Sequence, residues 1–266
     1  MSQQSGWQLA GTGPESYERH NVVAFMGTSR ELVALAALRS GERVLDVACG
    51  AGVLARLAAN AVGPTGKVAG ADLNEGMLSI ARAKAEQEGL PIEWRVCDAA
   101  ALSFPDEAFD VALCQWGLEF FPDRPRALRQ IARVLVPGGR LLLRVWRALD
   151  RQPFYVALLD ALGRQLGPGT GAPIRAAFAL SDAPVLCALV TDAGFSRVRM
   201  RITTNLLRFP SLEQYLFGYL AATPTAPQVA LMDDRGRAAP LGAVANALRT
   251  YITMTDWPRP WKTMSW

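Results

Sequence analysis

The sequence predicts an α/β protein: a doubly wound, mostly parallel sheet of seven strands with helices on both faces and a helical cap. Three observations support this prediction. Between residues 42 and 147, short apolar runs alternate with stretches of helical periodicity, as in parallel strands joined by helices. Several runs are apolar on consecutive residues, which indicates strands buried on both faces. After residue 146 this alternation stops, and glycine- and proline-rich joints separate apolar helical pieces.

Five apolar runs predict the first five strands, at residues 43–48, 67–72, 91–97, 109–115 and 140–146. A further run starts at residue 196 and alternates through Val198, Met200 and Ile202 with arginines between them, which predicts a sixth strand. Residues 257–266 could form a last strand. Pro258 and Pro260 favour an edge position for it.

Capping residues mark the predicted helices. Side chains able to cap an N-terminus precede four of them: Asn74, Asp123, Ser181 or Asp182, and Ser211. Gly89 and the Pro-Gly-Gly sequence at 137–139 lie where two helices should end.

The length of 266 residues suits one α/β domain with additions, or one domain and a small cap. We expect an N-terminal helical lid at 1–40 and the sheet core with its cofactor site at 41–149. A helical cap and substrate region that includes the sixth strand should follow at 150–240. A C-terminal helix and edge strand should end the chain at 241–266.

Composition excludes several classes of protein. Half of the residues are hydrophobic and 20% are charged, so the chain can bury a full core. No apolar run reaches the roughly 18 residues of a membrane span. The start of the chain lacks the basic and apolar segments of a secretory signal, which predicts a cytoplasmic location. The net charge of +4 comes from scattered arginines and is weak support for a nucleic-acid partner.

Cysteine and histidine usage predicts no metal site. The four cysteines form no CxxC pair, and no Cys/His cluster has zinc-ligand spacing. A Ser-His-Asp hydrolase could be built only around His20, the single histidine, and no G-x-S-x-G elbow accompanies it.

A strand, a glycine turn and the start of a helix stand together at residues 44–53. Glycine lets backbone N–H groups approach a ligand closely, because no side chain stands in the way. Gly50, Gly52 and Ala55 also satisfy the loose dinucleotide pattern G-x-G-x-x-[GA]. A nicotinamide-binding domain therefore has to be weighed.

Three aspartates at strand ends help to separate the possible ligands. Asp46 lies beneath the glycine turn, where it would repel a pyrophosphate but attract an ammonium group such as that of S-adenosylmethionine. Asp72 follows the turn by about 20 residues, which suits a bidentate grip on ribose hydroxyls in either ligand. Asp98 ends the third strand, where a carboxylate can accept a hydrogen bond from an adenine amino group.

These blocks resemble those of class I S-adenosylmethionine-dependent methyltransferases, and most of all the ubiquinone/menaquinone-biosynthesis type and its small-molecule relatives. The matching motifs lie, in order, at residues 44–52, 70–78, 97–100, 109–117 and 133–139. The resemblance covers residues 20–147 well and the remainder loosely. Cys49 and Ala51 stand where relatives often have other small residues, and both fit sterically. The resemblance implies a Rossmann-like fold.

The resemblance also implies site residues, with S-adenosylmethionine as cofactor and S-adenosylhomocysteine as product. The methionine portion would be held by Asp46, Ala48, Gly50 and Gly52. The ribose would bind Asp72, and the adenine would lie near Leu73, Met77, Asp98 and Ala99. Gln115 and Trp116 would line the place where the methyl group is presented. Met77 could equally be ordinary core, and Trp116 could simply pack against the fifth strand.

Methyl transfer from a sulfonium mainly needs proximity and alignment, because the leaving group is already activated. A general base is needed only for an acceptor that holds its proton at neutral pH. The candidates are Tyr17 and His20, on an expected helix at 15–26 that folds over the cofactor in relatives, and Glu119 after the fourth strand. Tyr17 also resembles a tyrosine that related enzymes place near the methionine moiety. His20 and Glu119 could equally be solvated.

The acceptor should lie over the carboxyl ends of the strands, beneath residues 150–240. Aromatic residues there predict a small, largely hydrophobic or aromatic acceptor, although they could simply form the core of the cap. The Gln-Trp-Gly-Leu sequence at 115–118 and the lack of a dense basic stripe disfavour nucleic acid. Two alternatives stay open: a nicotinamide-dependent oxidoreductase, and a member that binds S-adenosylmethionine without transferring methyl. The sequence does not determine the oligomeric state.

Overall fold

The structure of the chain is a computed structural model that describes residues 11, 13–204, 207–209, 211–223, 226, 242–253 and 262–264. The chain forms two compact units, each assembled from separate stretches of sequence. Among the described residues, the first unit comprises 28–146 and 180–201, and the second comprises those within 7–27, 147–179 and 202–266. The layout in four consecutive segments stays a prediction.

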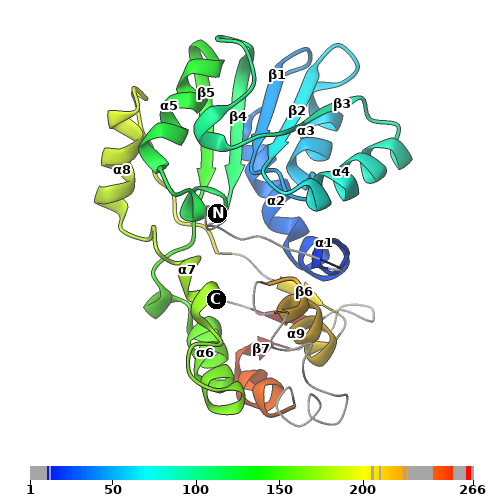
Figure 1. The fold of residues 1–266 in the computed structure, drawn as a ribbon, viewed down its shortest axis with the longest axis vertical. Helices are drawn as coiled ribbons and strands as arrows, with labels where there is room; N and C mark the ends of the chain where they lie inside the picture. Colours follow the sequence, from blue (N-terminus) through cyan, green and yellow to red (C-terminus); the bar gives the residue numbers. More distant parts are fainter. Residues whose placement is uncertain are drawn as a thin grey trace. The chain divides into compact units, whose positions relative to one another are not determined.

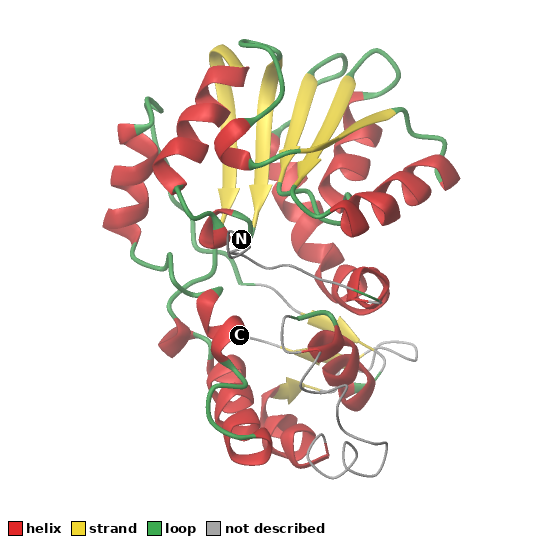
Figure 2. Ribbon diagram, in the orientation of Figure 1, coloured by secondary structure: helices red, strands yellow, loops and turns green. Residues whose placement is uncertain are grey.

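A five-stranded parallel sheet forms the centre of the first unit, in the order β3-β2-β1-β4-β5 (Figures 1 and 2). The strands are β1 (Arg43–Val47), β2 (Lys67–Asp72), β3 (Ile92–Val96), β4 (Phe109–Gln115) and β5 (Leu135–Arg144). All five runs predicted between residues 42 and 147 are therefore strands. The central pair β1 and β4 is almost fully buried, as the consecutive apolar residues predict.

Helices cover both faces of this sheet. They are α2 (Val23–Ala36), α3 (Val53–Val62), α4 (Glu75–Gln87), α5 (Arg124–Val134) and α8 (Ala183–Asp192). One apolar cluster packs α2 and α3 against Val44 and Val68, and another packs α5 and α8 against Leu45 and Ala69. Successive strand residues point to opposite faces, so the two clusters lie on opposite sides of the sheet. The predicted α/β arrangement is confirmed.

The predicted caps hold the helix starts. Asn74 Oδ1 accepts from the Met77 N–H at 3.1 Å, Asp123 from Arg126 at 2.9 Å, and Asp182 from Val185 at 3.0 Å. Short 3-10 turns follow β3 and β4, namely η2 (Ala99–Ala101) and η3 (Leu118–Phe120). The Pro-Gly-Gly sequence does not end a helix: α5 stops at Val134, and residues 137–139 lie within β5, where the pairing with β4 shifts register.

The prediction of seven strands in one sheet is wrong, because the main sheet has five in the part of the chain that the structure describes. The predicted sixth strand falls on described residues without regular secondary structure at 198–204. Its apolar side chains, Val198, Met200 and Ile202, are 38%, 51% and 68% exposed. Alternation with arginines imitates a half-buried strand, but a strand also needs a neighbour, and no described strand pairs with this run.

The second unit combines short helices with a small sheet. Its helices include α1 (Gly13–Ser16), the π-helical η1 (Tyr17–Val22), η4 (Leu149–Arg151), α6 (Pro153–Leu166), α7 (Ala172–Ala176), α9 (Leu212–Ala221) and η5 (Arg249–Tyr251). The antiparallel sheet has the order β6-β8-β7, with β6 (Leu207–Phe209), β7 (Ile252–Thr253) and β8 (Lys262–Met264). The last strand is thus the middle one of this sheet. Pro258 and Pro260, which suggested an edge, precede β8 and lie outside the described residues.

Aromatic side chains predicted to contact an acceptor form much of the core of the second unit. Tyr155, Phe178 and Tyr219 are 1%, 7% and 6% exposed. The Tyr155 ring lies edge-on to that of Phe178, with centroids 5.2 Å apart, and 6.2 Å from that of Tyr219. This packing supports the simpler interpretation, core residues of the cap. None of the described helices combines the length and the apolar character needed to cross a bilayer.

Candidate functional site

Strand order determines where a ligand-binding crevice can form in the first unit. The chain moves from β1 through β2 to β3 on one side, and β4 and β5 lie on the other side of β1. In open parallel sheets, ligands bind at the carboxyl ends of the strands where the order reverses. Figure 2 shows the carboxyl ends of the five strands along one edge. The turns after β1 and β4 therefore flank the candidate site.

The turn after β1 takes three left-handed backbone conformations. The φ angles are 55° at Ala48, 53° at Gly50 and 75° at Gly52, and Gly52 is the N-cap of α3. Two of these residues are glycine, which adopts positive φ without steric cost, whereas alanine does so only where the surroundings hold it. The sequence thus predicts the turn from its two glycines, whereas the strained, positive φ of Ala48 is seen only in the structure.

The Asp46 carboxyl lies beneath this turn and connects β1 to the start of α3. Its side chain is buried, with the residue only 1% exposed, and its Oδ2 accepts from the Ala55 N–H at 3.0 Å. Burial raises the pKa of this carboxyl well above its ordinary value, the Ala55 hydrogen bond lowers it, and nearby Asp72 raises it further. A positively charged ligand group would offset this cost of ionisation. Direct contact between Asp46 and a cofactor stays a prediction.

Asp72 joins the turns after β1 and β2. Its Oδ2 accepts from the Gly50 N–H and its Oδ1 from the Asn74 N–H, both at 2.8 Å. A carboxylate has about four acceptor positions, so two backbone bonds leave room for ribose hydroxyls. Burial raises its pKa, against the lowering effect of these backbone hydrogen bonds. Met77 is also brought here: its Cε lies 3.2 Å from the point where a Cβ on Gly50 would stand.

Trp94 on β3 is a site residue that the sequence interpretation missed. A Cβ on Gly52 would collide with the Trp94 ring and lie 2.9 Å from the Ala81 Cβ, and a Cβ on Gly70 would also strike Trp94. The indole therefore occupies the space that these two glycines leave. The signal available in the sequence was a large aromatic residue on the second strand after the glycine turn.

The remaining predicted adenine-binding residues lie at the ends of β2 and β3. Leu73 is 48% exposed although apolar, and Asp98 is exposed and accepts from the Ala100 N–H at 2.8 Å as the cap of η2. Ala99 is 8% exposed. Because Asp72 pairs with Val96 across β2 and β3, these residues share one edge of the sheet.

The segment after β4 meets the turn after β1. A Cβ on Gly117 would lie only 2.5 Å from the Ala48 Cβ. Gln115 Nε2 donates to the Ser29 Oγ of α2 at 3.0 Å, and Trp116 has a positive φ of 56°. The Trp116 ring stacks on Trp146, with centroids 4.7 Å apart and planes 8° from parallel. Trp146, which follows β5, was not predicted as a site residue.

Glu119 lies in the protein interior. It is 3% exposed, and its Oε1 accepts from the backbone N–H of Trp146 at 3.0 Å. Its Oε2 is buried without a hydrogen-bond partner among the described residues. Burial raises the pKa of this carboxyl to about 7, against smaller lowering effects of backbone hydrogen bonds and of Arg124. Glu119 is therefore not the solvated residue that the sequence left as an alternative.

Glu119 should make the stability of the protein depend on pH. The carboxyl has an ordinary pKa of 4.5 and a folded pKa of about 7, so folding favours its protonated form. This stabilisation is complete below about pH 4.5 and is lost as the pH rises through about 7, a loss of about 2–3 kcal/mol between pH 5 and 8. We expect Glu119→Gln to remove this part of the dependence, as measured by urea unfolding at both pH values. Equal pH dependence in the two proteins would contradict the assignment.

Tyr17 and His20 belong to the second unit, whereas Glu119 and the glycine turn belong to the first. Both residues lie on η1, and the His20 ring packs against α9, where a Cβ on Gly218 would collide with it. Burial and the charge of Arg19 lower the pKa of His20. The proposed catalytic roles of Tyr17 and His20 stay predictions.

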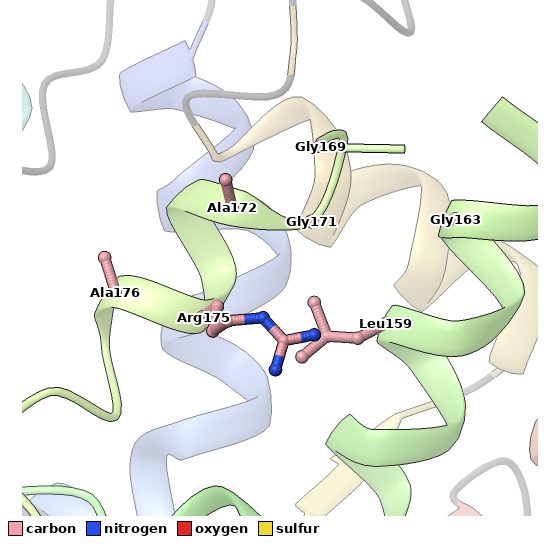
Figure 3. Close-up of a pocket in the computed structure, with 7 residues that line it drawn as sticks. All are labelled: Leu159, Gly163, Gly169, Gly171, Ala172, Arg175 and Ala176. Carbon is pink, nitrogen blue, oxygen red and sulfur yellow. The ribbon is translucent and has the colours of Figure 1, made fainter. Parts of the chain in front are cut away.

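A hollow of about 430 Å³ lies in the second unit between α6 and α7. Figure 3 shows Leu159, Gly163 and Arg175 lining it, with the Arg175 side chain directed from α7 toward Leu159. It contains none of the predicted site residues. No cluster of three His, Cys, Asp or Glu side chains among the described residues could hold a metal ion.

Comparison with known proteins identifies the family. The methyltransferase domain family matches residues 44–139. A 2-phytyl-1,4-naphtoquinone methyltransferase from Synechococcus elongatus is 46% identical over 132 residues, which cover 49% of this chain and 54% of that protein. The chain thus spans about half the length of this relative. The ubiquinone/menaquinone biosynthesis C-methyltransferase UbiE from Pseudomonas putida is 36% identical over 190 residues, covering 66% of this chain and 73% of that protein.

The chain belongs to the class I S-adenosylmethionine-dependent methyltransferases, of the UbiE-like type. Solved structures show the same fold. A putative methyltransferase from Bacillus halodurans superposes with a TM-score of 0.55 at 22% identity, covering 90% of this chain and 95% of that one. The [4+2]-cyclase SpnF superposes with a TM-score of 0.52 at 21% identity, covering 99% and 86%. The fold therefore serves more than one kind of chemistry.

Proposed function

We propose that this protein transfers the methyl group of S-adenosylmethionine to a small, largely hydrophobic or aromatic acceptor. The observation that carries the proposal is the Asp72 carboxylate, which holds the Gly50 turn and keeps acceptor positions for a ribose. The similarity to quinone methyltransferases supports a flat, apolar acceptor for this chain as well.

The chemistry of the side chains at this edge fits an adenosyl group. Asp72 offers acceptors to two vicinal hydroxyls, and Asp98 offers a carboxylate to an exocyclic amino group. Exposed Leu73 follows Asp72 directly and provides an apolar surface for a purine ring. Gly50 carries no side chain and so adds no bulk beside the methionine portion, whereas the space beside Gly52 is filled by Trp94.

The chain's own residues would act mainly by holding and aligning the reactants. When bound, S-adenosylmethionine supplies a methyl group on a positively charged sulfur. An ammonium group on a ligand would hold Asp46 ionised beneath the turn, against the burial that raises its pKa. Gln115 and Trp116 would line the place where the acceptor approaches, and the strained φ of Trp116 marks a position held by its surroundings.

Nicotinamide binding is less compatible with this edge. A dinucleotide would bring its pyrophosphate to the glycine turn, directly above buried Asp46. The cation at the start of α3, Arg56, is already engaged: it donates to the Ala51 carbonyl and pairs with Glu88. These contacts support the methyltransferase over the oxidoreductase.

Incubation with labelled S-adenosylmethionine and a panel of quinones, phenols and amines tests the proposal. We expect label transfer to at least one hydrophobic aromatic acceptor and cofactor binding measurable by calorimetry. Tight binding without transfer to any acceptor would favour a member that uses the cofactor without methylation. Binding of a nicotinamide dinucleotide in place of S-adenosylmethionine would overturn the proposal. The predicted cytoplasmic location and the lack of a nucleic-acid partner stay predictions.

A further inference from the structure

Three contacts tie the segment after β4 to the segment after β5 in the first unit. The Trp116 N–H donates to the Arg144 carbonyl at 2.8 Å. The Trp116 and Trp146 rings stack with centroids 4.7 Å apart. The Trp146 N–H donates to Glu119 Oε1 at 3.0 Å. Glu119 therefore holds the backbone of the residue on whose ring Trp116 stacks.

Glu119 is costly to bury. One of its carboxyl oxygens accepts from the Trp146 N–H, and the other has no hydrogen-bond partner among the described residues. A buried polar atom without a partner costs free energy, so its retention needs a reason.

The titratable and charged groups around Glu119 do not neutralise its carboxyl. On α5, the Arg124 guanidinium donates to the backbone carbonyls of Leu118 and Glu119, and its charge lowers the Glu119 pKa less than the backbone hydrogen bonds do. On β4, Cys114 is buried, and its own thiol pKa is raised partly by Glu119. The carboxyl therefore does not serve an ion pair with either group.

The position of the Trp116–Trp146 pair in the fold indicates a role for Glu119. Trp116 and Trp146 follow the carboxyl ends of β4 and β5, and Gly117 approaches Ala48 of the glycine turn, so the segments that carry the pair adjoin the candidate cofactor site. Both indoles are half-buried, so part of the pair stays accessible. A stacked pair of indoles offers a large, rigid apolar surface to a flat ligand.

We propose that Glu119 is a positioning residue: by accepting the Trp146 N–H it fixes the Trp116–Trp146 pair as the surface on which the acceptor ring rests. This inference rests on the proposed methyltransferase function. It assigns to Glu119 an indirect role through two tryptophans, in place of general-base catalysis.

Near-ultraviolet circular dichroism of the full chain tests the first half of the proposal without any assay of activity. Stacked indoles couple optically, and Trp116→Phe and Trp146→Phe define the signal of the pair. We expect Glu119→Ala to lose that signal and Glu119→Gln, whose amide oxygen still accepts, to keep it. Glu86→Gln, on the exposed face of α4, is the matched control and should change nothing. Should Glu119→Ala not fold, Glu119→Asp decides, since its shorter side chain cannot reach the Trp146 N–H.

Kinetics test the second half. We expect Glu119→Ala or Glu119→Asp to raise the KM for the acceptor at least about tenfold, while kcat and the cofactor Kd change less than about threefold and Glu119→Gln restores the KM. A full pair signal in the folded Glu119→Ala or Glu119→Asp protein would overturn the proposal, as would a fall in kcat alone in both Glu119→Ala and Glu119→Gln, which indicates a base. If no acceptor is methylated, the proposed function fails, and the dichroism still decides whether Glu119 holds the pair.

Discussion

Replacement of Asp72 by alanine is expected to weaken S-adenosylmethionine binding at least about 100-fold. The cofactor would lose two hydrogen bonds from its ribose hydroxyls to the carboxylate, each worth about 1.5–3 kcal/mol because the acceptor is charged. The substitution would also remove the carboxylate oxygens that now accept from the Gly50 and Asn74 N–H groups at 2.8 Å. Isothermal titration calorimetry measures the change.

Two companion variants make the Asp72 experiment specific. Asp106→Ala removes an exposed aspartate that pairs with Arg133 in the same unit, and it should leave the cofactor Kd unchanged. Asp72→Asn keeps one acceptor oxygen and should lose less affinity than the alanine variant. Unaltered affinity in Asp72→Ala would show that the ribose lies elsewhere.

Replacement of Gly52 by alanine is expected to destabilise the first unit by about 2–5 kcal/mol. Its φ of 75° costs a side-chain-bearing residue about 1–2 kcal/mol. In addition, the new Cβ would collide with Trp94 and lie 2.9 Å from the Ala81 Cβ, and overpacking of this kind costs about 1–3 kcal/mol. Urea unfolding followed by far-ultraviolet circular dichroism measures the loss.

Gly89 provides the matched control for Gly52. Its φ of 67° is similar, but no atom lies within 4 Å of its missing Cβ, so Gly89→Ala should show the conformational cost alone. The steric part should be partly recovered in Gly52→Ala combined with Trp94→Leu. Equal losses of unfolding free energy in Gly52→Ala and Gly89→Ala would mean that the Trp94 ring moves aside at little cost and does not restrict the turn.

The local sequence signals were sufficient for the sheet core and its caps. The five apolar runs became five parallel strands, because burial on both faces requires consecutive apolar residues. Asn74, Asp123 and Asp182 cap helices as predicted, since a cap depends only on the next three residues. Family membership was equally readable, from motifs that recur in order along residues 44–139.

Pairing between distant segments could not be read in the same way. The alternation at 198–202 is a local pattern, but a strand forms only where another edge accepts its hydrogen bonds, and none does among the described residues. Likewise β8 pairs on both sides, with strands at residues 207–209 and 252–253, although the prolines just before it suggested an edge.

Sequence alone determined the class of fold, the glycine turn with Asp46 and Asp72, and the family, because these depend on residue types at fixed short spacings. Tertiary structure decided which groups share an environment. It stacked Trp116 on Trp146, placed Trp94 over two glycines, and buried Glu119 beside the backbone N–H of Trp146, in the segment after β5. Burial and contact of this kind arise only when distant segments pack, and they raise the pKa of Glu119.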